Sequence, residues 1–127
     1  MRPEIHLIDD TWIAASPERV RAAVADPDNW ARWWPSVTLR VRRDRGLKGL
    51  QWDAGGNYTG TVELWLEPVR DGVVLHHFLR LNPARLSAHP RVRDGGRVAR
   101  RRARTEQRLA WHAKRVFWAL KDDLEGR

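Results

Sequence analysis

LAWHAKRVFWALKDDL, residues 109–124, is the stretch of sequence that decides the fold. Its apolar residues recur every three or four positions, which is the spacing of one face of an α-helix. Gly126 lies just beyond the last of them and is a typical residue for a helix end. The spacing therefore predicts a long terminal helix that starts near Val98 or somewhat later, ends near Glu125 and buries one apolar stripe. The stripe consists of Leu109, Ala113, Val116, Phe117, Leu120 and Leu124.

The region before this helix is predicted to form an antiparallel sheet. Its apolar and polar residues alternate at a period of two, and Gly-containing turns separate the later segments. Consecutive hairpins of this kind imply a meander. The expected strands cover residues 4–14, 36–43, 47–53, 58–68 and 73–81. In the second strand, Val37, Leu39 and Val41 are expected to face the core.

Two short helices are predicted between the first and second strands. Ser16-Pro17-Glu18 and Asp26-Pro27-Asp28 each combine a capping side chain, a proline at the first helical position and an acid near the positive end of the helix dipole. The first helix is expected to end at Ala25. Pro35 is expected to stop the second, which carries three tryptophans.

This order of elements resembles the helix-grip fold of the START-like (SRPBCC) superfamily, and most closely its bacterial polyketide cyclase/dehydrase or lipid-transport-like group. The resemblance depends on IAASPERV (13–20), WARWWPSV (30–37), and Leu66-Glu67-Pro68 followed by Asp71-Gly72. It implies an α+β fold in which an antiparallel sheet of about five strands curves around the long C-terminal helix, with two short helices after the first strand. The family usually places six strands between the second helix and the last, whereas this chain has room for about four. A shorter sheet would leave the cavity more open, or leave an edge and a face for a partner chain to cover.

Length and composition favour a single START-like helix-grip domain over residues 1–127. Residues 82–96 mix Pro, Gly, Asn and Arg without a period and are expected to form a mobile loop. Residues 97–125 are expected to be a basic lead-in followed by the C-terminal helix. No stretch approaches the ~18 apolar residues of a membrane span, and the first residues lack the apolar core of a secretory signal, so a cytoplasmic location is expected. Arginine and alanine usage indicates a bacterial origin.

The resemblance implies that the gap between sheet and terminal helix holds a small hydrophobic ligand, polyketide-like or lipid-like, in a largely apolar cleft. The same pattern has a second explanation, a dry core with no cavity, because apolar periodicity demands burial and not a pocket. The predicted lining residues are Trp33, Leu50, Trp52, Tyr58, Leu64, Leu66, Leu75, His77, Leu79, His112, Ala113, Val116, Phe117 and Leu120.

His77 and Tyr58 are the candidate catalytic residues. An imidazole between Leu75 and Leu79 is able to donate to a ligand carbonyl or to transfer a proton near neutral pH. The alternative is a core histidine bonded to a neighbour. The resemblance implies cyclase or dehydrase activity without a compact motif, and a binding protein is favoured. No cofactor is expected, and no metal, because the chain lacks cysteine and the adjacent His76 and His77 point to opposite faces of a strand.

The positive charge belongs to one segment of the chain. Residues 84–115 hold eleven basic and two acidic side chains out of a formal net charge of +8 for the whole sequence. The run from Arg97 to Arg108 predicts, as an alternative function, an interaction module that binds an anionic partner and has no ligand pocket. A membrane surface is a candidate, and nucleic acid is disfavoured because base-stacking aromatics are absent from the run. Trp65 and Phe78 are expected on the sheet face away from the helix, where they are a candidate homodimer contact or two scattered surface aromatics.

Overall fold

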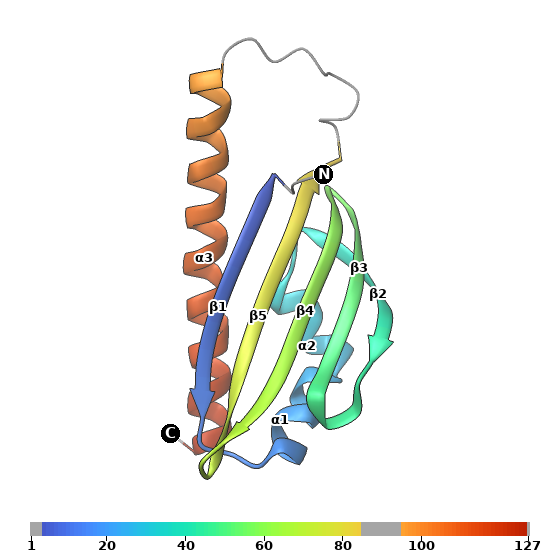
Figure 1. The fold of residues 1–127 in the computed structure, drawn as a ribbon, viewed down its shortest axis with the longest axis vertical. Coiled ribbons are helices and arrows are strands. Elements are labelled where there is room, and N and C mark those ends of the chain that lie inside the picture. Colours follow the sequence, from blue (N-terminus) through green and yellow to red (C-terminus); the bar gives the residue numbers. More distant parts are fainter. Residues whose placement is uncertain (1–3, 85–94, 127) are drawn as a thin grey trace.

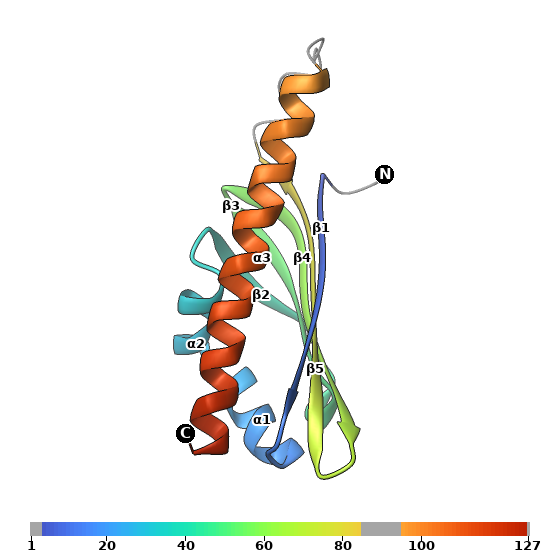
Figure 2. The same ribbon diagram turned by 90° about the vertical axis from the view of Figure 1, so that its left-hand side faces the viewer.

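The computed structural model describes residues 4–84 and 95–126, which form a five-stranded antiparallel sheet with the α-helices on one of its faces (Figures 1 and 2). The predicted α+β helix-grip class, with two short helices after the first strand, is confirmed. The strand order in the sheet is β1-β5-β4-β3-β2. The elements are β1 (Ile5–Ile13), α1 (Pro17–Val24), α2 (Pro27–Trp33), β2 (Val37–Asp44), the 3₁₀ turn η1 (Gly46–Lys48), β3 (Gly49–Gly56), β4 (Tyr58–Val69), β5 (Gly72–Pro83) and α3 (Gly95–Glu125).

The two short helices begin where their capping residues predict. The Ser16 hydroxyl accepts a hydrogen bond from the Arg19 backbone N–H at 3.2 Å, and the Asp26 carboxylate accepts one from the Asp28 N–H at 3.0 Å. A proline follows each cap and fixes a helical φ without wasting a donor. The local sequence therefore turns the chain twice directly after β1 and delivers α2 to the inner face of the sheet.

Several expected bounds are wrong by a few residues. The third strand begins at Gly49, not residue 47, because Leu47 and Lys48 lie in the η1 turn. Gly49 has a φ of +115°, and a Cβ there would lie 1.9 Å from the Leu64 carbonyl oxygen, so only glycine fits this close approach. Val41, which was expected to face the core, is 43% exposed, and the ladder slips directly after it, between Val41 and Arg43.

The expected loop over residues 82–96 is too long at both ends. Asn82 and Pro83 belong to β5, and α3 begins at Gly95, before Val98. Residues 85–94 lie outside the described part of the chain. The arginine run is therefore helical, and α3 rises beyond the end of the sheet in Figures 1 and 2.

Aromatic side chains fill the middle of the space between helices and sheet. Trp52 of β3 is fully buried, and its ring centroid lies 5.2 Å from that of Trp30 and 5.0 Å from that of Trp34. Trp33 contacts Phe117 of α3 at a centroid distance of 5.3 Å. These rings join α2, β3 and α3 into one core and exclude ligand from the centre of the molecule.

The C-terminal half of α3 is bound to the edge strand β1. Lys121 Nζ donates to the Trp12 carbonyl and to Glu125, each at 2.7 Å, and Glu125 also accepts the Ala14 backbone N–H at 2.8 Å. Lys114 makes an ion pair with Asp9 at 2.7 Å. Within the described residues, no helix has the length and apolar character needed to cross a bilayer.

Candidate functional site

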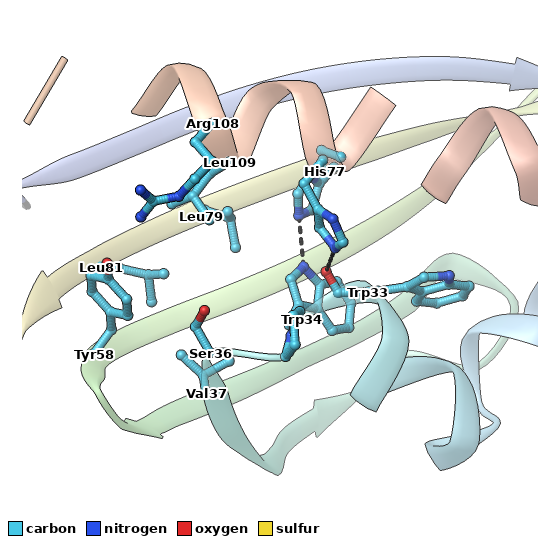
Figure 3. Close-up of a pocket in the computed structure, with 13 residues that line it drawn as sticks. Trp33, Trp34, Ser36, Val37, Tyr58, His77, Leu79, Leu81, Arg108 and Leu109 are labelled. Atoms are coloured by element: carbon cyan, nitrogen blue, oxygen red, sulfur yellow. Dashed lines mark hydrogen bonds between the residues drawn. The ribbon is translucent and has the colours of Figure 1, made fainter. Parts of the chain in front are cut away.

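A cavity of about 220 Å³ lies between α3, the end of α2 and the inner face of β4 and β5 (Figure 3). Its wall is mostly apolar, with a few polar groups at separate positions, as in small-molecule sites generally. Its lining consists of Trp33, Trp34, Pro35, Ser36, Val37, Tyr58, His77, Leu79, Leu81, Arg108, Leu109, His112 and Ala113.

His77 is the polar group in the buried wall of this cavity, and its side chain is 1% exposed. The indole Nε1–H of Trp34 donates to its Nε2 at 3.0 Å, the contact drawn between the two rings in Figure 3. An indole nitrogen only donates, so Nε2 must be the unprotonated acceptor and the ring proton sits on Nδ1. That Nδ1 is buried and has no hydrogen-bond partner among the described residues.

Burial, and then the nearby His112, lowers the pKa of His77 to about 3. Desolvation disfavours the imidazolium, and a second histidine adds to that effect. His77 is therefore neutral at physiological pH, and its one N–H has no acceptor among the described residues. Proton transfer near neutral pH, the other role expected for this residue, does not fit a pKa so far below 7.

His112 connects α3 to the end of α2. Its Nε2 lies 3.0 Å from the Trp33 carbonyl and 3.2 Å from the Arg32 carbonyl, so Nε2 carries a proton and donates to both. These carbonyls belong to the last turn of α2, where backbone acceptors lack helical partners. His112 thus holds the tryptophan-bearing helix end against the cavity.

The entrance of the cavity carries Ser36, Tyr58 and Arg108, which also line an adjoining open hollow of about 650 Å³. In Figure 3 the Arg108 guanidinium lies on the side of Leu81 and Tyr58, at the opposite end from Trp34 and His77. Arg108 is exposed and makes no ion pair with another described residue. The site therefore has a cationic entrance, an apolar middle and a neutral donor at its buried end.

The structure brings six of the predicted site residues together in the cavity wall: Trp33, Tyr58, His77, Leu79, His112 and Ala113. The others do not line this cavity, because the aromatic cluster around Trp52 and Phe117 occupies the middle of the gap. The dry-core explanation thus holds for the centre of the gap and not for this end. The residues outside the lining are Leu50, Trp52, Leu64, Leu66, Leu75, Val116, Phe117 and Leu120.

Sequence reasoning did not assign Trp34, Ser36, Leu81 and Arg108 to the site. Leu81 continues the Leu75, His77, Leu79 alternation by one more step, so the period-two pattern was a usable signal. Trp34 lies at the C-cap of α2, with a non-helical φ of −133°, and no periodicity predicts where such a side chain points.

The outer face of the sheet carries the expected aromatic pair. Trp65 is 36% exposed and stacks on His76 with centroids 4.4 Å apart, and the His76 ring lies 6.5 Å from that of Phe78. Asp10 and Glu67 each contact one nitrogen of His76, at 2.7 and 2.8 Å. The helices lie on the opposite face in Figure 2.

No family model and no curated protein matches this chain. Solved structures do match over nearly its full length. The Aha1 dimer from Colwellia psychrerythraea has a TM-score of 0.59 and 16% identity, covering 95% of this chain and 96% of that one. A Deinococcus radiodurans protein has a TM-score of 0.64 and 10% identity, covering 96% and 99%. The polyketide-cyclase-like protein Cgl2372 from Corynebacterium glutamicum has a TM-score of 0.56 and 16% identity, covering 96% and 94%.

These similarities confirm the expected helix-grip fold, which this chain shares with the polyketide-cyclase-like neighbour. At such identities the fold is what is shared, and function has to be argued from the site.

Proposed function

We propose that this protein binds a small hydrophobic or aromatic ligand, polyketide-like or lipid-like, in the cavity between α2, α3 and the sheet. The observation that carries the proposal is an apolar cavity of about 220 Å³ whose buried wall holds the unpartnered Nδ1–H of His77. A buried donor without an acceptor is unfavourable by about 1–3 kcal/mol, so a ligand oxygen that reached this N–H would be stabilised.

The size of the cavity supports a compact ligand. An engineered apolar cavity of about 150 Å³ holds benzene. A volume of about 220 Å³ therefore suits one or two rings, with any longer part extending through the entrance toward Ser36, Tyr58 and Arg108. The cationic entrance favours a ligand whose outer end is acidic or phenolic.

A cyclase or dehydrase reaction is a second candidate function, and the polyketide-cyclase-like name of one structural neighbour supports it. In such a reaction His77 would polarise a carbonyl through its neutral N–H, since its low pKa prevents it from acting as a base. Tyr58 lies at the entrance and is the other hydroxyl-bearing candidate from the sequence.

Filling the cavity tests the binding proposal. Val37 is partly buried and lines the cavity, so Val37→Trp is expected to block it without opening the core. A panel of one- and two-ring phenols, aromatic acids and medium-chain fatty acids is titrated against the wild type by tryptophan fluorescence and thermal melting. A ligand at a hundredfold excess over its Kd stabilises by about 2.7 kcal/mol, or roughly 10 °C in Tm for a domain of this size.

Val41→Trp is the matched control, because Val41 lies on the same strand but is exposed and lines no part of this cavity. Binding that Val37→Trp abolishes and Val41→Trp preserves supports the proposal. Equal binding by both variants, or no binding by the wild type across the panel, contradicts it.

We also propose that the outer aromatic face, defined by Trp65, His76 and Phe78, is a contact between two copies of the chain. The face is aromatic and carries no described helix, and one structural neighbour is a dimer. An isologous contact would place the same face on both copies.

A further inference from the structure

The outer side of α3 carries an unusual row of side chains. Arg100, Arg104, Arg108, Trp111, Arg115 and Trp118 follow one another at steps of three or four residues, so they form one stripe along the helix. All six are exposed, and Trp111 and Trp118 are 65% and 58% exposed. The stripe runs opposite to the buried residues Ala113 and Phe117, and in Figure 2 α3 lies in front of the sheet with no described element over it. We call these six residues the Arg/Trp stripe.

The charges of the Arg/Trp stripe are not neutralised within the described protein. Its four arginines make no ion pair with another described residue. Basic residues on the sides of the same helix do find partners: Arg102 lies 3.6 Å from Glu4, and Lys114 lies 2.7 Å from Asp9. The ion pairs of the described part of α3 thus lie beside the stripe and not on it.

Exposed tryptophans among arginines make this surface different from a solvated charged face. A large apolar ring in water is unfavourable, and two of them two turns apart on one helix face form a repeated feature. Tryptophan concentrates at the boundary between lipid headgroups and acyl chains, and arginine binds anionic headgroups there. From Arg100 to Trp118 the stripe is about 27 Å long at 1.5 Å per residue, enough to lie flat on a membrane surface.

We propose that the Arg/Trp stripe docks α3 on the surface of an anionic lipid bilayer. The stripe is a convex rod on which Arg115 separates the two rings, so it lacks the groove and contiguous stacking platform by which proteins hold single-stranded nucleic acid. Arg108 belongs both to the stripe and to the cavity entrance, so docking brings that entrance close to the lipid surface. An apolar ligand would then pass between bilayer and cavity with little exposure to water.

Co-sedimentation of the full chain with vesicles tests the proposal. Vesicles containing phosphatidylglycerol are expected to bind the protein, and pure phosphatidylcholine vesicles much less, with binding that weakens as salt is raised. Arg104→Ala with Arg115→Ala is expected to weaken binding about 30-fold, because each arginine near an anionic surface contributes about a factor of five. Trp111→Ser with Trp118→Ser is expected to lower it roughly tenfold or more.

Matched variants elsewhere serve as controls. Arg40→Ala with Arg43→Ala removes the same charge from exposed positions of β2, and Leu47→Ser removes an exposed apolar side chain from the η1 turn. The controls are expected to bind nearly as the wild type does. Equal binding to both kinds of vesicle, or stripe variants that bind like the controls, would overturn the proposal. So would stripe variants that lose only RNA binding or self-association, because the occupant would then be nucleic acid or a second copy.

Discussion

Replacing His77 by glutamine should make the protein's stability less sensitive to acid, and the structure sets the size of the effect. The imidazole is buried, accepts a hydrogen bond from Trp34, and has a pKa lowered to about 3 from 6.5. In the unfolded chain the same ring takes up a proton below pH 6.5. The native state does not, so the wild type loses stability as the pH falls from 6.5 toward 3.

The loss from this one group is about 1.4 kcal/mol for each pH unit below 6.5, or about 2.7 kcal/mol at pH 4.5. A glutamine at position 77 keeps an acceptor for the Trp34 N–H and has nothing to titrate. At pH 7.5 the free energies of unfolding of the wild type and His77→Gln differ only by the cost of replacing the imidazole ring with a side chain of another shape. The difference in their free energies of unfolding should then shift by about 2.7 kcal/mol in favour of the variant between pH 7.5 and pH 4.5.

Urea unfolding followed by circular dichroism, at several pH values between 7.5 and 4.5, measures this difference. Carboxylates that titrate over the same range are present in both proteins and cancel. His6→Gln is the control, because His6 is exposed on β1. If the difference between the free energies of unfolding of the wild type and His77→Gln stays constant with pH, the inference that burial holds His77 neutral is refuted.

Two further outcomes are expected. Gly49→Ala should lower the free energy of unfolding by well over 1 kcal/mol, because the new Cβ would meet the Leu64 carbonyl. Gly46→Ala is the control, because Gly46 has a φ of +64° but open space around it, and it should lower the free energy of unfolding by about 1 kcal/mol. Equal urea midpoints for the two variants would contradict the close approach at Gly49. Trp65→Glu should convert the proposed dimer to a monomer, as measured by sedimentation velocity, and Trp118→Glu is the control on another face. A wild type that is monomeric at all concentrations would contradict the proposed outer-face contact.

The sequence was sufficient to predict the fold where burial and periodicity coincide. Ile5, Leu7 and Ile13 alternate with exposed neighbours along β1, and Leu75, His77 and Leu79 share the inner face of β5, as expected. The period-two pattern gave the wrong strand bounds where the backbone departs from a regular strand. Leu47 looks like the first residue of a strand, but it is 48% exposed in a 3₁₀ turn.

The site could be predicted only in part because its position depends on which side chains fill the gap. Alternation correctly put Trp52 and Leu64 on the inner face, and both are fully buried. Whether an inner-face residue lines a cavity or a dry core depends on the rings of Trp34 and Phe117, which meet from two helices. Their directions follow from tertiary contacts, which a period-two or period-3.6 pattern does not contain.

The sheet has fewer strands than the START-like proteins that the sequence resembles usually have, which raises the question of what covers its edges and faces. One edge, β1, is covered by α3, through the Lys121 and Lys114 contacts to its backbone and to Asp9. The other edge, β2, is exposed, but it carries several arginines and a slip in the ladder after Val41, both of which discourage pairing with another strand. Neither edge therefore needs a partner chain to cover it. Of the surfaces that the short sheet was expected to leave open, the outer face around Trp65 is the one that a second copy could cover.

On the inner face, the bulk of Trp30, Trp34 and Trp52 takes up space that a wider sheet would enclose as cavity. A five-stranded sheet can thus keep a closed core and still leave a small apolar cavity, at the end of the gap beside Trp34 and His77.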